Sequence, residues 1–262
     1  MATDNFIKLF KEEPIPILYE DRSILAIDKP AGWMLVPFSW QRTNRNLQAA
    51  IVSSIGAGHY WARSRAIRFL KYIHRLDAET TGILLFAKSQ GGLDSFGELF
   101  ETRRVEKIYL AVTDAEPEQA AWTCRLPLGP DPAQHGLMRV DKQGKDAETA
   151  FRVVASANGL HLIEARPSTG RQHQIRIHLA ESGCPIVADE LYGNPEDALM
   201  GLRAVGLAYR DPFTGRPVTI RAPVEEFLKY FGFAPEVYRL QFQSLPPRAE
   251  NSPLTNPRRG RG

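Results

Sequence analysis

Asp77 is the residue of this sequence that is best placed to do chemistry. It lies within residues 74–82 (HRLDAETTG), directly before the apolar run 83–87. A short apolar run predicts a buried strand, and a rigid strand can hold a preceding loop residue in position for a reaction. The neighbouring guanidinium of Arg75 favours the ionised carboxylate. Such a carboxylate can act as a nucleophile or as a base, but not as a general acid.

A second carboxylate, Glu79, follows with one residue between. On an extended segment the Cα atoms of Asp77 and Glu79 would lie roughly 6.5 to 7 Å apart and face the same way. Glycosidases use two carboxylates separated by ~5 to 9.5 Å, so a glycosidase is one candidate class. The surroundings are rich in arginine rather than in further carboxylates, and this disfavours a glycosidase.

The basic residues gather near the segments that could form a site. The formal net charge is +3, a mildly basic balance that fits a polyanionic partner. The clusters are Arg63, Arg65, Arg68, Lys71 and Arg75, then Arg103, Arg104 and Lys107, and later Arg166, Arg171 and Arg176. Clusters of this kind are what a nucleic acid backbone requires. An RNA enzyme and a non-catalytic RNA-binding protein would both use them, while any single cluster could equally be a solvated helix face.

No metal or nucleotide cofactor is expected. Cys124 and Cys184 stand alone, so we expect two buried thiols rather than a zinc site or a disulfide. His173 and His178 are five residues apart and cannot easily share a metal from one regular element. The sequence has no Walker-type phosphate loop, no GxGxxG opening a helix and no GxSxG elbow.

A cytoplasmic, monomeric protein is expected. The apolar runs are far shorter than the roughly 18 residues that suggest a membrane span. Residues 1–11 lack the apolar stretch of a signal peptide.

Hydrophobic periodicity predicts the elements that would position Asp77. Two strands around a turn at residues 20–23 form a hairpin within 15–32, and an Asn158-Gly159 turn joins strands 149–155 and 160–165. Helices are predicted at 46–54, at 90–102 and from about 174 to Gly183. Further strands are predicted at 105–112, 199–208 and 217–222, short strands and turns at 116–145, and a short closing element at 227–231. We expect a lead at 1–13, one catalytic domain at 14–244 and a disordered basic tail at 245–262.

Residues 74–82 resemble the HRLDxxTSG motif of the RluA-type pseudouridine synthases, with Thr81 in place of the more usual serine. Other segments resemble this family in the same order, namely 17–21 (ILYED), 28–32 (DKPAG), 106–111 (EKIYLA), 169–176 (TGRQHQIR) and 189–193 (DELYG). The resemblance spans about residues 15–223. With only a short lead before residue 15, we expect a catalytic domain without the S4-type RNA-binding domain that many relatives carry.

The resemblance implies a fold and a reaction. The fold is α+β, with a mixed, mainly antiparallel sheet, flanking helices and a central active-site cleft. The reaction detaches a uridine of ribosomal or transfer RNA at its glycosidic nitrogen, turns the uracil and rejoins it through C5, without a metal or cofactor. Asp77 would be the catalytic carboxylate, acting on the sugar or base by attack or by removing a sugar proton. Glu79 would then be a solvated or loop-ordering residue.

The resemblance also implies roles for the neighbours of Asp77. Arg176 would pair with Asp77 and hold it ionised. Tyr109, which its strand pattern alone favours as a core residue, would lie against the flipped base. Arg75 would fill the gap left by the extruded uridine, with a phosphate contact as the alternative. The other expected RNA-binding residues are His74, Arg104, Lys107, Arg171 and Gln174.

Overall fold

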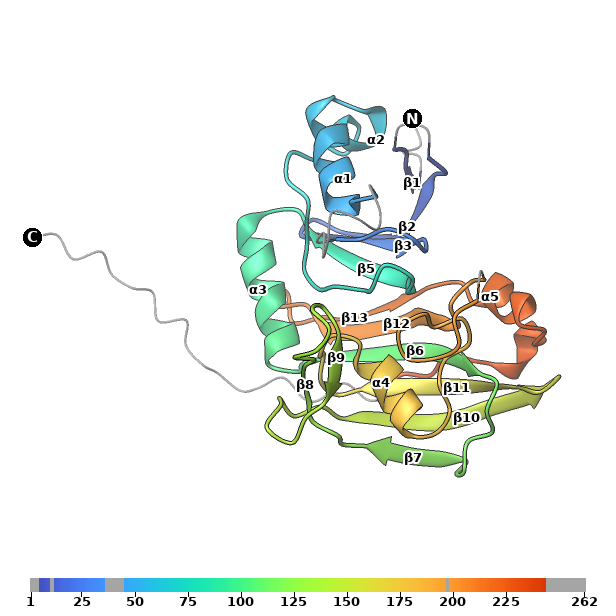
Figure 1. Cartoon of the computed structure of the whole chain (residues 1–262). Helices are drawn as coiled ribbons and strands as arrows, with labels where there is room; N and C mark the ends of the chain where they lie inside the picture. Colours follow the sequence, from blue (N-terminus) through green and yellow to red (C-terminus); the bar gives the residue numbers. More distant parts are fainter. Residues whose placement is uncertain (1–4, 10–11, 36–44, 197, 244–262) are drawn as a thin grey trace, which may run out of the picture.

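A twisted sheet carries the fold and runs through the whole described chain (Figure 1). The computed structural model describes residues 5–9, 12–35, 45–196 and 198–243. The predicted basic tail at 245–262 lies outside the described residues. The sheet has 11 strands in the order β1-β2-β3-β5-β12-β6-β11-β10-β7, with β13 paired to β12 and β4 to β5. A small second sheet pairs β8 with β9.

The strands of the large sheet are β1 (Phe6–Ile7), β2 (Ile15–Glu20), β3 (Ile24–Lys29), β4 (Lys71–Tyr72), β5 (Thr81–Ala87), β6 (Val105–Thr113), β7 (Ala121–Cys124), β10 (Thr149–Ala157), β11 (Leu160–Pro167), β12 (Leu202–Arg210) and β13 (Pro217–Arg221). The small sheet joins β8 (Leu128–Pro130) and β9 (Met138–Val140). The helices are α1 (Leu47–Gly56), α2 (Tyr60–Arg63), α3 (Gln90–Glu101), α4 (Gln174–Glu181), α5 (Glu225–Tyr230) and the 3-10 turn η1 (Pro235–Val237).

The strand pairs are antiparallel except for β5 and β12, which run parallel at the middle of the sheet. This confirms the predicted α+β class with a mixed, mainly antiparallel sheet. The β5–β12 pair explains the glycine at the end of the Asp77 motif. Gly82 has a φ of +107°, and a Cβ atom there would lie 2.1 Å from the carbonyl oxygen of Ala204. Only glycine fits this conformation and this approach of two backbones.

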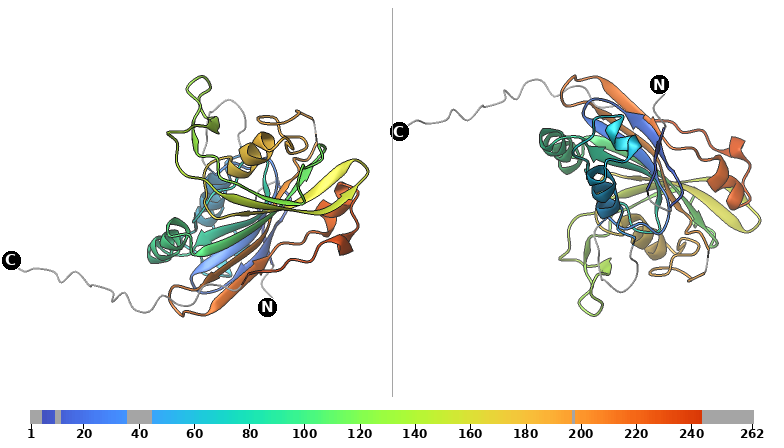
Figure 2. Two further views of the ribbon diagram at one scale, coloured as in Figure 1. Left: turned by 90° about the horizontal axis from the view of Figure 1, so that it is seen from below. Right: turned by 90° about the horizontal axis from the view of Figure 1, so that it is seen from above.

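Helices cover both faces of the sheet, and seen from below (Figure 2) α4 and α5 lie on opposite sides. Alternation along β5 serves the two faces, because Leu84 and Phe86 pack with α1 and α2 while Ile83 and Leu85 pack with α3. α4 shares its face with α1 and α2 but packs on β6 and β11. The gap between these two helical layers lies over β6 and β12, and the cleft described below forms there.

Two parts of the chain differ from the prediction. Residues 1–13 were expected to be a lead outside the domain, but β1 pairs with β2 and Ile7 is fully buried. No element was predicted directly after α1, yet the segment forms α2 and buries Trp61, whose indole N–H donates to Ser54 Oγ at 2.8 Å. Both elements depend on contacts with distant residues, which a local pattern does not contain.

Apart from the short elements β4 and η1, which were not predicted, the remaining elements lie where periodicity placed them, within a few residues. The Asn158-Gly159 hairpin turn has φ angles of 55° and 76°, as a tight turn between twisted strands requires. Cys124 and Cys184 are buried free thiols, as predicted. None of the described helices is long and apolar enough to cross a membrane.

Candidate active site

The predicted central cleft is present over the middle of the sheet. Two cavities of about 480 and 870 Å³ lie side by side, and both are lined by Asp77. They also share Arg75, Leu76, Gln172, His173 and Arg176. The Asp77 carboxylate therefore stands where the two cavities meet.

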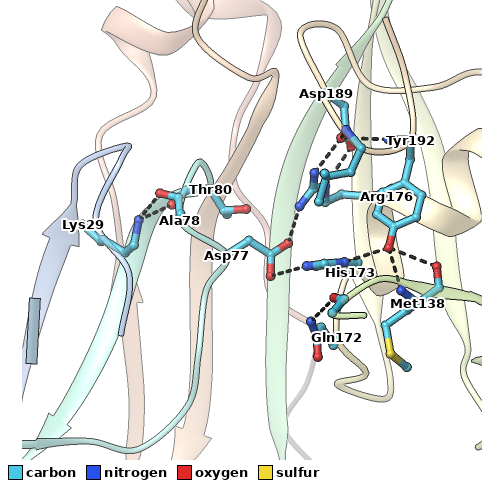
Figure 3. A network of polar contacts seen from close by, with 12 residues as sticks. Lys29, Asp77, Ala78, Thr80, Met138, Gln172, His173, Arg176, Asp189 and Tyr192 are labelled. Atoms are coloured by element: carbon cyan, nitrogen blue, oxygen red, sulfur yellow. Dashed lines mark hydrogen bonds and ion pairs between the residues drawn. The ribbon is translucent and has the colours of Figure 1, made fainter. Parts of the chain in front are cut away.

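Arg176 fixes the Asp77 carboxylate (Figure 3). The guanidinium Nη1 of Arg176 lies 3.1 Å from Asp77 Oδ2, while its Nε and Nη2 donate to the two oxygens of Asp189 at 2.8 and 2.6 Å. The two-pronged contact with Asp189 orients the guanidinium plane, so that its remaining edge points at Asp77. The expected pairing of Arg176 with Asp77 is therefore present in the structure.

Asp189 is a buried anchor to which sequence reasoning gave no role. Its carboxylate is fully buried and also accepts the backbone N–H groups of Leu191 and Tyr192 at 2.9 and 3.1 Å. Burial alone would raise the pKa of Asp189, but hydrogen bonds and charge from Arg176 outweigh burial and hold that pKa below its usual value. The Tyr192 ring lies under the Arg176 guanidinium at 5.3 Å, a further cation–π contact. The feature of the sequence that could have indicated this role is the carboxylate at the start of residues 189–193 (DELYG).

His173 is a second residue of the site that sequence reasoning had considered only as a metal ligand. It precedes α4 with φ 55° and ψ 17°, a left-handed conformation. Its Nδ1 lies 2.8 Å from the Tyr192 hydroxyl and its Nε2 lies 3.8 Å from Asp77 Oδ1. Among the described residues, no three His, Cys, Asp or Glu side chains are grouped so that they could hold a metal ion.

Lys29 holds the loop that carries Asp77. Its ammonium is fully buried and donates to the carbonyl oxygens of Ala78 and Thr80 at 2.7 and 3.0 Å (Figure 3). It also donates to the carbonyl oxygen of Pro30 at 2.9 Å. Burial lowers the pKa of Lys29 to about 8. The hairpin β2–β3 is thus joined directly to the part of the motif loop that follows Asp77. Sequence reasoning noted the DKPAG segment but did not find this contact.

Tyr109 lies on β6 beside the cleft. Alternation directs Ile108 and Leu110 to the α5 face, whereas Tyr109 packs on the face that carries Asp77. It is half-buried and lines the smaller cavity. Burial, and then the negative charge of Asp77, raise the pKa of its phenol well above the usual value. A neutral aromatic ring beside the carboxylate offers an apolar surface to a planar base.

Three of the expected RNA-binding cations line the cleft. Arg75 is exposed and borders both cavities. Arg171 and Lys107 border the smaller one, where the Lys107 ammonium donates to the Thr169 carbonyl oxygen at 2.6 Å. Burial, and then the charges of Arg103 and Arg171, lower the pKa of Lys107 to about 8.

Of the other three expected RNA-binding residues, His74 and Gln174 also border the smaller cavity, but their side chains bond within the protein. His74 accepts the N–H of Leu85 at 3.2 Å and stacks on Phe100, and burial lowers its pKa to about 3. The amide of Gln174 is only 4% exposed and bonds within the protein, to Thr169, Thr149, Glu148 and Arg171. Arg104 pairs with Glu98 at 2.7 Å and does not line the cavity. Its neighbour Arg103 lines the cavity instead. These three positions fit support of the loops better than contact with RNA.

Comparison with known proteins identifies the family. Residues 23–181 match the family model described as RNA pseudouridylate synthase, and the chain belongs to this family. The protein is therefore an enzyme that converts uridine to pseudouridine in RNA. This assignment replaces the glycosidase and the non-catalytic RNA-binding protein as candidate classes.

Relatives and solved structures agree with this assignment. The chain is 34% identical over 226 residues to a ribosomal large subunit pseudouridine synthase C of Salmonella typhimurium, covering 81% of this chain and 67% of the relative. The protein of that name from Vibrio vulnificus is 32% identical over 222 residues, with 81% and 67% coverage. Human RNA Pseudouridylate Synthase Domain Containing 1 and 4 share the fold with TM-scores of 0.64, at 23% and 24% identity. Each match covers 82% of this chain. It covers 86% of the chain of the first human protein and 90% of that of the second.

Proposed function

We propose that this enzyme modifies uridines of ribosomal RNA and that Asp77 is its catalytic carboxylate. The Asp77–Arg176–Asp189 arrangement carries the proposal, because it presents one oriented carboxylate at the junction of two cavities. The printed name of the bacterial relatives, ribosomal large subunit pseudouridine synthase, supports ribosomal RNA as the substrate. Transfer RNA is the alternative substrate.

Asp77 begins the rearrangement by attack on the sugar or base, or by removing a sugar proton. Arg176 holds it ionised and fixes its rotamer. Tyr109 supports the flipped uracil, and stacking of this kind contributes about 1 to 3 kcal/mol per base. No step requires a metal or cofactor.

RNA binding falls to the cations around the cleft. Arg75, exposed and bordering both cavities, enters the position that the extruded uridine vacates. Unstacking a base costs a few kcal/mol, and a side chain that replaces it offsets part of that cost. Lys107 and Arg171, joined by Arg103, contact phosphates beside the smaller cavity.

The enzyme acts as a monomer in the cytoplasm. Support for the monomer is that side chains of one chain line both cavities and supply every contact of Asp77 described above. Light scattering of the purified protein with and without RNA tests this point, and a mass of two chains would contradict it.

Mapping pseudouridines tests the substrate. Deleting the gene is expected to remove pseudouridine from one or more positions of ribosomal RNA, and expression of the intact protein is expected to restore it. The Glu79→Gln variant, altered at an exposed residue near Asp77, is expected to restore it equally. Loss confined to transfer RNA would contradict ribosomal RNA as the substrate.

A further inference from the structure

The side chain of His173 is held against the reacting carboxylate by a strained backbone. A non-glycine residue in the left-handed region costs about 1 to 3 kcal/mol and persists only where its surroundings fix it. Here the imidazole is 10% exposed and lies between Tyr192 and Asp77 (Figure 3). It borders both cavities, so it faces the space that the uridine must occupy.

The hydrogen bonds around Tyr192 define which imidazole nitrogen carries the proton. The Tyr192 hydroxyl donates to the carbonyl oxygen of Met138 and accepts the N–H of Met138, both at 3.0 Å. A phenol has one proton, which is thereby used. We take the tautomer in which the Tyr192 proton stays on the bond to Met138, so that His173 Nδ1, 2.8 Å from the same oxygen, is the donor. The other nitrogen, Nε2, carries a lone pair.

That lone pair is directed at the reaction centre. Nε2 lies 3.8 Å from Asp77 Oδ1, which is beyond hydrogen-bond distance. Neither of these two atoms holds a proton, so they do not bond to each other. Burial lowers the pKa of His173. The negative charge of Asp77 opposes this shift but is outweighed by burial, and the positive charge of Arg176 lowers the pKa further. The imidazole is therefore a neutral base beside an anion.

The reaction must move one proton that Asp77 alone does not account for. When the new bond from C5 to the sugar forms, C5 carries both the sugar and its original hydrogen. Loss of that hydrogen as a proton returns the C–H electron pair to the ring and restores the C5–C6 double bond. The product carries a proton on N1, so one proton leaves C5 and one reaches N1 without any oxidant or reductant.

We propose that His173 is a second catalytic residue, whose Nε2 accepts the proton that leaves C5. The imidazolium that forms lies 3.8 Å from the Asp77 carboxylate, which stabilises it. The proton then passes to N1 or to water, and the imidazole is neutral again. This inference rests on the proposed role of Asp77. After attack on the sugar, or after removal and return of a sugar proton, the carboxylate is ionised again once the new bond has formed. After attack on the base, the carboxylate leaves the ring as the C5 proton is lost and the C5–C6 double bond re-forms.

The test compares target RNA containing ordinary uridine with target RNA containing uridine deuterated at C5, in single turnover. The variant is His173→Asn, because asparagine tolerates the left-handed conformation better than most residues but is not a base. Pseudouridine formation is expected to slow about 100-fold, as for loss of a general base. The ratio of the rates on the two RNAs is expected to rise above the wild-type ratio, while RNA affinity changes by less than about threefold.

Two further variants serve as a control and as an independent test of the His173 hydrogen bond. His161→Asn alters a histidine that bonds Ser156 on the β10–β11 hairpin, and it is expected to leave rate and ratio unchanged. Tyr192→Phe removes the hydroxyl that holds Nδ1 as donor, and it is expected to raise the ratio less than His173→Asn does. A slow His173→Asn variant with the wild-type ratio would show a structural role and overturn the proposal, as would an unchanged rate. Activity in Asp77→Asn would contradict the proposed function instead, leaving the ratio in His173→Asn as a separate result.

Discussion

At the scale of single residues, the site depends on one guanidinium that serves two carboxylates. Arg176 uses Nε and Nη2 for Asp189 and Nη1 for Asp77. Burial alone would lower the pKa of Arg176. Its hydrogen bonds to Asp189 and the charges of Asp77 and Asp189 outweigh burial and raise that pKa above its usual value. The Asp77 carboxylate is thus positioned by a group that is itself rigidly held.

Arg176→Lys is expected to lower the catalytic rate about 100-fold, the scale of effect that a misplaced reacting group produces. An ammonium is a point charge and cannot bond both oxygens of Asp189 while it also reaches Asp77. RNA affinity is expected to stay near the wild-type value, because Arg176 is buried. Single-turnover rates and filter binding measure the two quantities. Arg152→Lys, at an exposed arginine that pairs with the buried Glu164, is the control. A fully active Arg176→Lys variant would contradict this account.

Asp189→Asn is expected to lower the free energy of unfolding by about 3 kcal/mol at pH 7, since it breaks a buried ion pair. The pKa of Asp189 is held below its usual value, so its ionised form contributes stability above about pH 4. That contribution is lost as the pH falls through the lowered pKa. The difference between wild type and variant should therefore shrink as the pH is lowered below 4. Urea unfolding over this pH range measures it, and a constant difference would contradict the assignment.

At the scale of elements, the hairpin β2–β3 and the strand pair β5–β12 hold the part of the motif loop that follows Asp77. Lys29 bonds the carbonyl oxygens of Ala78 and Thr80, and Gly82 packs its backbone on Ala204. Asp77 thereby gains a rigid mounting although it lies in a loop.

Lys29→Met keeps the length of the side chain but removes the ammonium that donates to three carbonyl oxygens, of which that of Ala78 still accepts the N–H of Gly32. It is expected to destabilise the protein by about 1 to 3 kcal/mol and to speed amide exchange across residues 78–80. Hydrogen exchange read by mass spectrometry measures this. The matched control is Lys88→Met on a partly exposed pair with Glu20, with an expected cost of about 1 kcal/mol or less. Equal effects of the two substitutions would contradict the role of Lys29.

Gly82→Ala is expected to be among the most damaging single-methyl additions in this chain. Its Cβ would meet the Ala204 carbonyl oxygen at 2.1 Å, in a backbone conformation that disfavours alanine. Displacing two paired strands should cost more than about 3 kcal/mol. Gly97→Ala in α3 adds its methyl to open space and is expected to stabilise by about 0.5 to 1 kcal/mol. Thermal unfolding compares the pair, and a neutral Gly82→Ala would refute the close approach.

Local patterns predicted the elements that carry their own signals. The Asn158-Gly159 turn and the apolar alternation of β5 are visible in a few consecutive residues. α2 and β1 were missed because distant contacts create them, through Trp61 bonding Ser54 and Ile7 pairing with Ile15.

At the scale of the whole molecule, the local sequence pointed to Asp77, the family resemblance added Tyr109 and Arg176, and the fold brings these three residues to one cleft. The sequence did not reveal Asp189 or Lys29 as supports, because each acts on residues far away in the chain. For the same reason it did not reveal that the buried amide of Gln174, which borders the smaller cavity, also orders the loop before α4. Burial and partners are properties of the fold.

The charge of the molecule is also organised by the fold. Arg75, Arg103, Lys107 and Arg171 come from separate segments and gather around the smaller cavity. The gathering suits a backbone of phosphates, whereas the formal net charge of +3 alone is a weak indication.

The most direct test of the account is pseudouridine formation by Asp77→Asn on a bound target RNA in single turnover. Asparagine keeps the size of the side chain and can still accept a hydrogen bond from Arg176, but it is neither a nucleophile nor a base. We expect RNA affinity within about threefold of wild type and no detectable pseudouridine. Pseudouridine formation at the wild-type rate would contradict the catalytic role of Asp77.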